Sequence, residues 1–374
     1  MKKVLFTANL DSFFYKFLIP YLKWFKEHGY EVHVATKGNN FKIPYCDKRF
    51  DVCFARTPFT FDNIKSYNQL KKILKENKYD IIHCHTPFGG AITRFAAKKA
   101  RKEGTKVIYT AHGFHFFEGA SKKDWLIFYN SEKYLSRLTD VIVTINKSDY
   151  EQAKKFYAKK TYLIHGIGAD EEKFKIDLTK EEKDKLRKSV KVNKSDFVMM
   201  YPAELNNNKN QMMLIDAMKI LVEKDKKYKL LLPGQDSLNG KLQERVKELG
   251  LEKNIIFLGF RKDISKLLQI TDLSVATSKR EGLPVNIIEA MYAGLPVVCT
   301  NTRGQIDLIK NNVNGFVCES GDYKKFAKCI EKIAKDKNLA KKFSIQNKKD
   351  VQKYLLENTL KEMSKIYLEE MKGE

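Results

Sequence analysis

The sequence lacks several patterns that define common classes of protein. Its six cysteines are scattered and include no C-x-x-C pair, which argues against a disulfide framework and favours a reduced protein. No apolar run approaches the roughly 20 residues that a membrane-spanning helix needs, and no signal peptide is evident. Low-complexity tracts and short repeats are also missing, which argues against a solenoid. These absences predict a cytoplasmic globular protein.

Basic charge, in contrast, is abundant and uneven. The net charge is +24. Residues 1–165 hold 30 Lys and Arg against 15 Asp and Glu, or +15, and residues 166–374 hold 40 against 31, or +9. Such a field attracts phosphate-bearing partners such as nucleic acid, anionic lipid or a lipid diphosphate, although lysine-rich composition can also reflect the base composition of the coding sequence. Because the basic residues are dispersed and no nucleic-acid module is visible, we expect no nucleic-acid partner.

Strand-like apolar runs alternate with helical patterns twice along the chain. The runs lie at 3–8, 31–36, 50–55, 79–84, 106–111 and 140–146, and again at 197–203, 228–233, 254–258, 272–276, 296–300 and 315–318. This alternation predicts parallel sheets covered by helices on both faces. The charged stretch 171–196 interrupts it, so we place a domain boundary near 165–170.

Two glutamates, Glu281 and Glu289, lie eight positions apart in the most informative segment, 280–291. Gly282 permits a tight turn, and Pro284 suits the first helical position because its missing N–H would be unsatisfied there anyway. A helix from Pro284 would leave Glu281 on the loop ahead and Glu289 about one and a half turns in. The free N–H groups at its start would suit a phosphate, which indicates a nucleotide-sugar site. A loop glutamate and a solvated helix glutamate would give the same pattern.

Lys209 marks a second candidate site. It follows the strand-like run 197–203 and lies where a helix of about 210–223 begins. The dipole at the start of a helix disfavours a positive side chain, and a bound diphosphate would remove that conflict. A solvated lysine in a polar turn is the alternative.

Together these segments resemble glycosyltransferase family 4, the retaining sugar-nucleotide transferases of the GT-B fold. Glu281-x7-Glu289 matches the family signature, and the continuation 290–298 is also similar. Residues 163–170 resemble the interdomain segment, and 209–211 resemble the diphosphate-binding loop. The stretches 18–25 and 110–116 are similar to the branch that makes bacterial capsular and exopolysaccharides.

The resemblance implies an α/β fold with two facing, doubly wound Rossmann-like domains. We expect an acceptor-binding domain at 1–165 and a nucleotide-sugar-binding domain at 166–354. The last helix, within 355–374, would cross back and pack on the first domain. Ligands in such sheets bind beyond the carboxyl ends of the strands.

The resemblance also assigns roles to residues. Glu281 would orient the transferred sugar, Lys209 would stabilise the leaving diphosphate, and His112 would contact the donor sugar near its 6-position. Glu289 would hold the ribose. Further donor-binding candidates are Gly282, Leu283, Pro284, Gly234, Phe260, Arg261 and Glu204, although the segments at 233–235 and 259–261 could be ordinary turns. Asp11, Ser12 and His115 are weaker acceptor-binding candidates.

The chain departs from the family at two places. Glu204 occupies the position that usually holds an arginine, so either Arg280, Arg261 or backbone N–H groups compensate, or the diphosphate is held less tightly. Residues 9–12 replace a paired-glycine loop, and Asp11 or Ser12 could equally cap the helix that starts at 13.

These observations predict a retaining glycosyltransferase of surface-polysaccharide biosynthesis. It would move a sugar from a UDP-hexose or UDP-N-acetylhexosamine to a lipid-linked or oligosaccharide acceptor. No cofactor or metal is expected, because the sequence has no Asp-x-Asp triplet for a metal-bridged diphosphate and no histidine cluster with zinc spacing. The alternatives are a UDP-sugar epimerase of the same fold, a glycosidase-style carboxylate pair, a basic nucleic-acid-binding protein and a catalytically silent scaffold.

Aromatic and lysine residues alternate at 13–25 and at 114–126. Combined with the basic excess of residues 1–165, they predict peripheral attachment to the anionic inner face of the cell membrane. Many of the aromatic residues in 13–25 would serve equally well as core residues.

Overall fold

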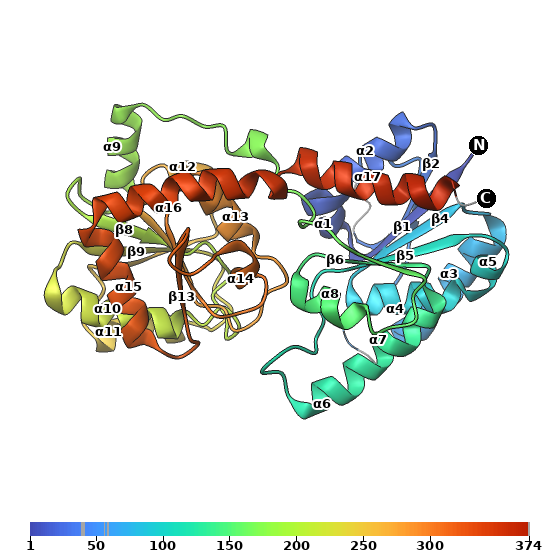
Figure 1. Ribbon diagram of the computed structural model, residues 1–374, viewed down its shortest axis with the longest axis horizontal. Helices are drawn as coiled ribbons and strands as arrows, with labels where there is room; N and C mark the ends of the chain where they lie inside the picture. Colours follow the sequence, from blue (N-terminus) through green and yellow to red (C-terminus); the bar gives the residue numbers. More distant parts are fainter. Residues whose placement is uncertain (39–41, 56, 58–59, 373–374) are drawn as a thin grey trace. The chain divides into compact units, whose positions relative to one another are not determined.

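The computed structural model describes residues 1–38, 42–55, 57 and 60–372. Its contacts divide the chain into two units, one of Met1–Gly168 with Glu357–Glu374 and one of Ala169–Leu356. Each unit is built on a wholly parallel sheet. Helices cover both faces of each sheet (Figure 1). The expected pair of doubly wound α/β units is confirmed.

The first sheet has seven strands in the order β3-β2-β1-β4-β5-β6-β7. They are β1 Lys3–Leu10, β2 Glu31–Lys37, β3 Lys48–Asp51, β4 Ile81–His85, β5 Lys106–Ala111, β6 Val141–Thr144 and β7 Lys160–Leu163. Between β1 and β4 the order of strands reverses, and ligands bind at such a switch point. The sequence did not predict β7, because this edge strand has no continuous apolar run and is only partly buried.

Several helical segments of the first unit are divided into shorter pieces. The helices of this unit are α1 Asp11–Phe13, α2 Ile19–Glu27, α3 Phe61–Glu76, α4 Pro87–Ala96, α5 Lys98–Lys102, α6 Lys122–Asp124, α7 Asn130–Leu135 and α8 Lys147–Ala153. Two π-helical turns, η1 Phe14–Leu18 and η2 Trp125–Tyr129, join α1 to α2 and α6 to α7, and a 3₁₀ turn, η3 Ser136–Leu138, follows α7. Pro20 has no N–H to bond the carbonyl of Lys16, which removes one α-helical hydrogen bond beside η1.

The final helix, α17 Leu356–Lys372, belongs to the first unit from Glu357 onward. The buried Tyr367 ring lies 4.6 Å from the Phe25 ring of α2, and its hydroxyl bonds Nδ1 of His83 at 2.7 Å. Glu362 accepts a hydrogen bond from the backbone N–H of His165. These contacts confirm that the last helix packs on the first unit.

The second sheet has six strands in the order β10-β9-β8-β11-β12-β13. They are β8 Phe197–Met200, β9 Tyr228–Pro233, β10 Ile255–Gly259, β11 Leu273–Ala276, β12 Val297–Thr300 and β13 Gly315–Cys318. Its helices are α9 Lys180–Ser189, α10 Gln211–Lys224, α11 Lys241–Glu248, α12 Ile264–Leu268, α13 Val285–Tyr292, α14 Gln305–Leu308, α15 Tyr323–Lys335 and α16 Lys337–Asp350, with short turns η4 Glu171–Lys173 and η5 Val351–Tyr354. The switch point lies between β8 and β11.

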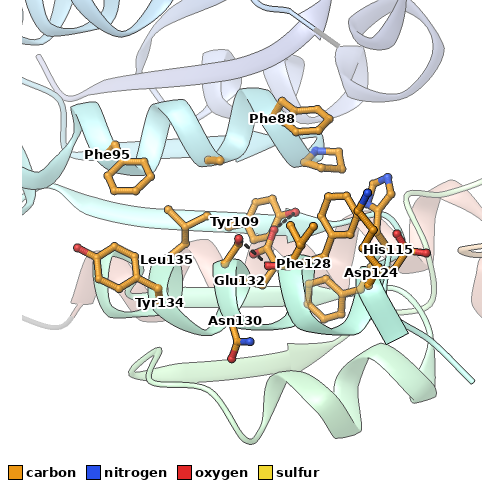
Figure 2. Close-up of a pocket in the computed structure, with 17 residues that line it drawn as sticks. Phe88, Phe95, Tyr109, His115, Asp124, Phe128, Asn130, Glu132, Tyr134 and Leu135 are labelled. Carbon is orange, nitrogen blue, oxygen red and sulfur yellow. Dashed lines mark hydrogen bonds between the residues drawn. The ribbon is translucent and has the colours of Figure 1, made fainter. Parts of the chain in front are cut away.

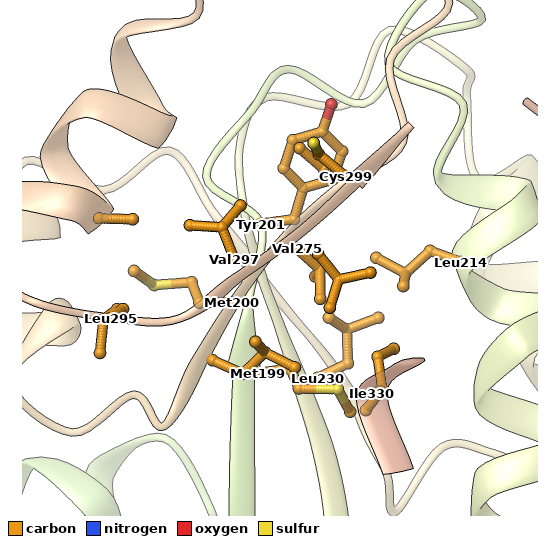
Figure 3. Close-up of a cluster of buried hydrophobic side chains, with 14 of the residues drawn as sticks. Met199, Met200, Tyr201, Leu214, Leu230, Val275, Leu295, Val297, Cys299 and Ile330 are labelled. Carbon is orange, nitrogen blue, oxygen red and sulfur yellow. The ribbon is translucent and has the colours of Figure 1, made fainter. Parts of the chain in front are cut away.

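One contiguous apolar core holds the second unit together (Figure 3). Met200, Leu230, Val275 and Val297 come from four different strands and are fully buried. Burial on both faces explains why these strands appear in the sequence as continuous apolar runs. Among the described residues, no helix combines the length and the apolar character needed to cross a membrane.

Candidate functional site

In the second unit, the loops after β8 and β11 bring Lys209 and Glu281 together. Lys209 Nζ donates to Glu281 Oε1 at 2.5 Å, and Ser278 Oγ donates to the same oxygen at 2.6 Å. The two side chains are 22% and 13% exposed. Both of these hydrogen bonds go to Oε1. The other carboxylate oxygen, Oε2, accepts no hydrogen bond from the described residues. The sequence placed both residues at a ligand site but did not predict that they form an ion pair.

Hydrogen bonds between the two loops hold this pair in place. Thr277 Oγ1 lies 3.0 Å from the carbonyl oxygens of Lys209 and Asn210. The Lys279 N–H donates to the Asn208 carbonyl at 2.8 Å, and Asn208 Nδ2 donates to the Arg280 carbonyl. Groups fixed in this way need little rearrangement when charge develops on a ligand, which is the condition for strong electrostatic stabilisation.

The turn from Glu281 into α13 differs slightly from expectation. Pro284 has ψ 112° and is the N-cap, so α13 begins at Val285 and not at the proline. Arg303 Nε donates to the Glu281 carbonyl at 3.0 Å. Gly304 has φ +77°, and a Cβ there would collide with the carbonyl oxygen of Gly282.

Arg303 and Gly304 therefore support the Glu281 loop, a role that the sequence did not reveal. Their position directly after β12 was the available signal, because side chains at neighbouring strand ends converge.

Glu289 is half-buried on α13. Burial raises the pKa of its carboxyl group from 4.5 to about 7, and Lys173 partly opposes the rise. None of the described residues donates a hydrogen bond to this carboxylate. A desolvated carboxylate of this kind gains stability when a ligand supplies hydroxyl donors.

The remaining donor-binding candidates differ in their surroundings. A Cβ at Gly234 would collide with the Ala203 carbonyl, which explains the glycine by close packing of two strand ends. Leu283 packs against the core, and Phe260 is 72% exposed.

Two side chains expected near the diphosphate, Arg261 and Glu204, already have hydrogen-bond partners within the protein. Arg261 binds Asp263 through Nε at 2.8 Å and Nη2 at 2.6 Å. Glu204 is exposed and accepts a hydrogen bond from Ser237 Oγ at 2.5 Å. Of the groups that could replace the arginine missing at position 204, Arg261 is therefore already bound to Asp263. Arg280 and the backbone N–H groups remain candidates.

In the first unit, His112 follows β5 and is half-buried. Its Nε2 lies 3.1 Å from Nδ1 of His85, which ends the neighbouring strand β4, and its ring packs edge-on against Phe13 at 5.1 Å. Burial lowers the pKa of His112 to about 4, so the ring is neutral at neutral pH. Burial also lowers the pKa of His85 far below 6.5. The sequence assigned no role to His85, yet it contacts the ring that the resemblance assigns to the sugar.

The structure separates the three acceptor-binding candidates. Ser12 and His115 both line a cavity of about 350 Å³ beside η1, together with Lys16. Asp11 is buried, and its carboxylate binds Arg49 at 3.2 and 3.1 Å. Neither Asp11 nor Ser12 caps α1, whose N-cap is Leu10 without a side-chain bond. Across the described residues, no group of three or more His, Cys, Asp or Glu side chains is placed to hold a metal ion.

Comparison with known proteins identifies the family to which this chain belongs. The family model for glycosyl transferases group 1 matches residues 182–350, and the model for glycosyl transferase 4-like proteins matches residues 3–146. The putative glycosyltransferase EpsD of Bacillus subtilis is 43% identical over 368 residues, which cover 98% of this chain and 96% of that protein. The chain belongs to the glycosyltransferase group 1 family. The resemblance to glycosyltransferase family 4 is thereby confirmed.

Further relatives and structures agree with this membership. An Escherichia coli galactosyltransferase, named as transferring from UDP-Gal to α-D-GlcNAc-diphosphoundecaprenol, is 30% identical over 74% of this chain and 72% of its own length. The crystal structure of Anabaena HepE with UDP and glucose superposes with a TM-score of 0.81 at 21% identity and covers 99% of this chain and 100% of that one. Sucrose-phosphate synthase from Thermosynechococcus elongatus gives 0.79 at 16% identity, covering 99% of each chain. These structures share the GT-B fold with this glycosyltransferase.

Proposed function

We propose that this glycosyltransferase moves a hexose or N-acetylhexosamine from a UDP-sugar to a lipid-linked acceptor, with retention of the anomeric configuration, in surface-polysaccharide biosynthesis. The observation that carries the proposal is the Lys209–Glu281 pair at the switch point of the second sheet. Lysine and the start of α13 would bind the diphosphate, and Glu281 would orient the sugar through Oε2.

Each partner of this pair has a distinct task in the proposed reaction. As the bond between the sugar and the diphosphate lengthens, negative charge grows on the departing phosphate oxygen. Lys209 neutralises that charge, the kind of assistance that often supplies the largest part of catalysis. The phosphate takes the proton of the acceptor hydroxyl on the same face of the sugar, so neither glutamate acts as a nucleophile. Glu289 accepts hydrogen bonds from the ribose.

Support for the donor and the acceptor comes from different relatives. HepE is described in complex with UDP and with UDP-glucose, which favours a UDP-linked donor. The E. coli relative is named for a diphosphoundecaprenol acceptor, which favours a lipid-linked acceptor here. The positive charge of residues 1–165 suits a peripheral position on an anionic membrane surface, where such an acceptor resides. No metal is required in this proposal, because Lys209 and the helix start supply the positive charge.

A donor panel tests the proposal. Purified protein is incubated with UDP-glucose, UDP-galactose, their N-acetylamino forms and GDP-mannose, with a lipid-diphosphate-linked sugar as acceptor. We expect a glycosylated lipid from one UDP-sugar, with an axial anomeric bond by NMR when the donor bond is axial. Inversion would overturn the retaining assignment, and productive use of GDP-mannose alone would overturn the UDP assignment. Release of an epimerised sugar and UDP without acceptor would indicate an epimerase.

A further inference from the structure

An apolar cavity of about 730 Å³ lies in the first unit between α4 and the η2–α7 segment. Figure 2 shows Phe88 and Phe95 on α4 facing Phe128, Tyr134 and Leu135 on the opposite segment. Its volume falls in the range of about 300–1,000 Å³ that is typical of small-molecule sites. None of the residues discussed for donor binding lines it.

Several polar groups of the cavity are already bonded within the protein. Glu132 holds the buried Arg94 through two hydrogen bonds of 2.8 and 3.2 Å. Asn130 Nδ2 and Ser131 Oγ donate to carbonyl groups one turn back in their own helix, at 2.6 and 2.7 Å. Asp124 accepts a hydrogen bond from Ser121. With these groups occupied and aromatic and aliphatic side chains forming most of the wall, the cavity presents mainly apolar surface to a ligand, which favours a hydrocarbon over a sugar.

At one end this cavity meets the smaller one that holds Ser12 and Lys16. The two share Pro87, Phe88 and His115. α4 begins at Pro87, so the positive end of its dipole faces the junction. Thr86, the N-cap of α4, has φ +65°, a strained conformation for a β-branched residue and one that clusters at ligand sites. The junction therefore combines cationic groups with the entrance to an apolar space.

The rim of the cavity carries large apolar side chains that water reaches. Of the lining residues, Ile127 is 44% exposed, Phe95 43% and Tyr134 53%, and Leu126, next to Ile127 in the chain, is 69% exposed. Contiguous exposed apolar groups of this kind mark binding sites, because leaving them in water is unfavourable. The rings of Phe95 and Tyr134 lie 6.0 Å apart between the two helices.

We propose that the cavity between α4 and η2–α7 holds the hydrocarbon chain of an amphiphilic phosphate acceptor. The phosphate lies at the junction, near Lys16, His115 and the start of α4, and Lys123 adds positive charge on the cavity wall. The inference rests on the proposed transfer to a lipid-linked acceptor and names the part of the protein that recognises the lipid. Both π-helical turns border the ligand, η1 along the head group and η2 along the chain, and π-helical segments frequently occur at functional sites.

Chain-length dependence of binding tests the proposal on the full-length protein. Butyl phosphate and dodecyl phosphate are titrated by calorimetry below the micellar concentration. Wild-type protein is expected to bind the dodecyl compound at least tenfold more tightly. Ala91→Trp, which fills the cavity, and Ile127→Gln, which makes its rim polar, should reduce that ratio at least threefold. Ile64→Gln, at a residue 62% exposed on α3, should leave the ratio unchanged.

Circular dichroism and cooperative thermal unfolding show whether each variant, which is altered in the first unit, is folded. Equal binding of both alkyl phosphates by wild-type protein would overturn the inference, as would an unchanged ratio in folded Ala91→Trp and Ile127→Gln. A concentration-dependent dimer that Ile127→Gln abolishes, with no chain-length effect, would assign the surface to a second copy of the chain instead.

Transfer assays separate this inference from the proposed function. If wild-type and Ala91→Trp glycosylate short-chain and long-chain lipid diphosphates equally well, the inference fails and the proposed function stands. If wild-type protein binds dodecyl phosphate in the cavity but glycosylates no lipid-linked acceptor, the proposed function fails and the binding site stands.

Discussion

Two ion pairs of this glycosyltransferase, Arg94–Glu132 in the first unit and Lys209–Glu281 in the second, differ in how fully their atoms are bonded. Arg94 in the first unit is fully buried, and its guanidinium binds both oxygens of Glu132, lies 3.9 Å from the Tyr109 ring centre and donates to the Gly90 carbonyl. Lys209 and Glu281 in the second unit are partly exposed, and one carboxylate oxygen accepts no hydrogen bond from the described residues. A saturated pair holds a fold together, whereas an unsaturated pair can exchange partners with a ligand.

The residues that surround the two pairs also differ in polarity. The loops around Lys209 are polar and are tied together by hydrogen bonds from side chains to backbone carbonyl groups. Around Glu132 the walls are aromatic and aliphatic, and a π-helical turn replaces regular helix. The two sheets are wound alike about their switch points, so the difference between the polar candidate site and the apolar cavity arises in the connections.

The largest expected effect is on stability. Glu132→Leu leaves the buried Arg94 charge without its partner and should lower the free energy of unfolding by about 3–5 kcal/mol. Replacing both residues, as Arg94→Met with Glu132→Leu, should recover much of that loss. Glu151→Ala, which breaks an exposed pair with Lys154, should change stability by less than about 1 kcal/mol. Denaturant unfolding of the four proteins measures these differences, and equal losses in Glu132→Leu and Glu151→Ala would contradict the structural role.

The next effect is on catalysis. Lys209→Ala and Glu281→Gln should each lower kcat/KM for sugar transfer by about 100-fold or more, with little change in unfolding. The double variant should lose no more than about tenfold beyond either single one, because directly bonded groups act as a unit. Lys224→Ala, which breaks a lysine–glutamate pair at the far end of α10, is the matched control. Near-normal turnover in both single variants would remove the assigned roles.

A smaller effect concerns the pH dependence of donor binding. Glu289 has a pKa of about 7, above its usual 4.5, so it is ionised at pH 8 and mostly protonated at pH 6. We assume that only the ionised carboxylate accepts hydrogen bonds from both ribose hydroxyls. The affinity for a UDP-sugar should then fall about tenfold from pH 8 to pH 6, because the ionised fraction falls by about that factor across a pKa of 7. A UDP-sugar is preferred over UDP, whose terminal phosphate itself titrates near pH 6.

Glu289→Gln is the comparison for this titration. It should bind the UDP-sugar more weakly at pH 8 and show no pH dependence between 6 and 8. If wild-type and variant affinities fell in parallel as the pH was lowered, another group would be responsible.

The smallest effect is expected at the membrane surface. Within the aromatic stretch 114–126, the Trp125 indole N–H donates to the Phe117 carbonyl and its ring packs beside Phe116, so Trp125 is engaged within the protein. The exposed apolar residues are instead Leu126 and Ile127. Changing both to serine should weaken sedimentation with anionic vesicles a few-fold, whereas Ile64→Ser should not.

Binding to anionic vesicles should also weaken near 1 M salt, where the Debye length is about 3 Å. Equal recovery in the supernatant with anionic and zwitterionic vesicles at low salt would remove the membrane proposal. A saccharide acceptor in solution would then be favoured.

Most of the fold was predictable because buried parallel strands leave continuous apolar runs in the sequence. For this reason, the apolar runs at 296–300 and 228–233 predicted the strands Val297–Thr300 and Tyr228–Pro233. β7 was missed because an edge strand buries too little to leave such a run. The π-helical turns were missed as well, since the periodicity of side chains differs little between a π turn and an α-helix over five residues.

The candidate site was predictable in its motifs and not in its contacts. Glu281, Glu289 and Lys209 were identified from spacing around a helix start and from family resemblance. The ion pair of Asp11 joins it to Arg49, 38 positions away, and the contact of His85 joins it to His112, 27 positions away. No local sequence pattern predicts contacts between residues so far apart in the chain.

By itself, the sequence determined the alternation of strands and helices, the family and the identity of the charged residues near the donor, because these depend on local spacing and on residue type. Only the tertiary structure decided which oxygen of Glu281 is left to accept a hydrogen bond, that burial raises the Glu289 pKa, and that an apolar cavity opens between α4 and α7. Hydrogen-bond partners, desolvation and cavities arise from segments that meet in space after folding. No spacing along the chain encodes them directly.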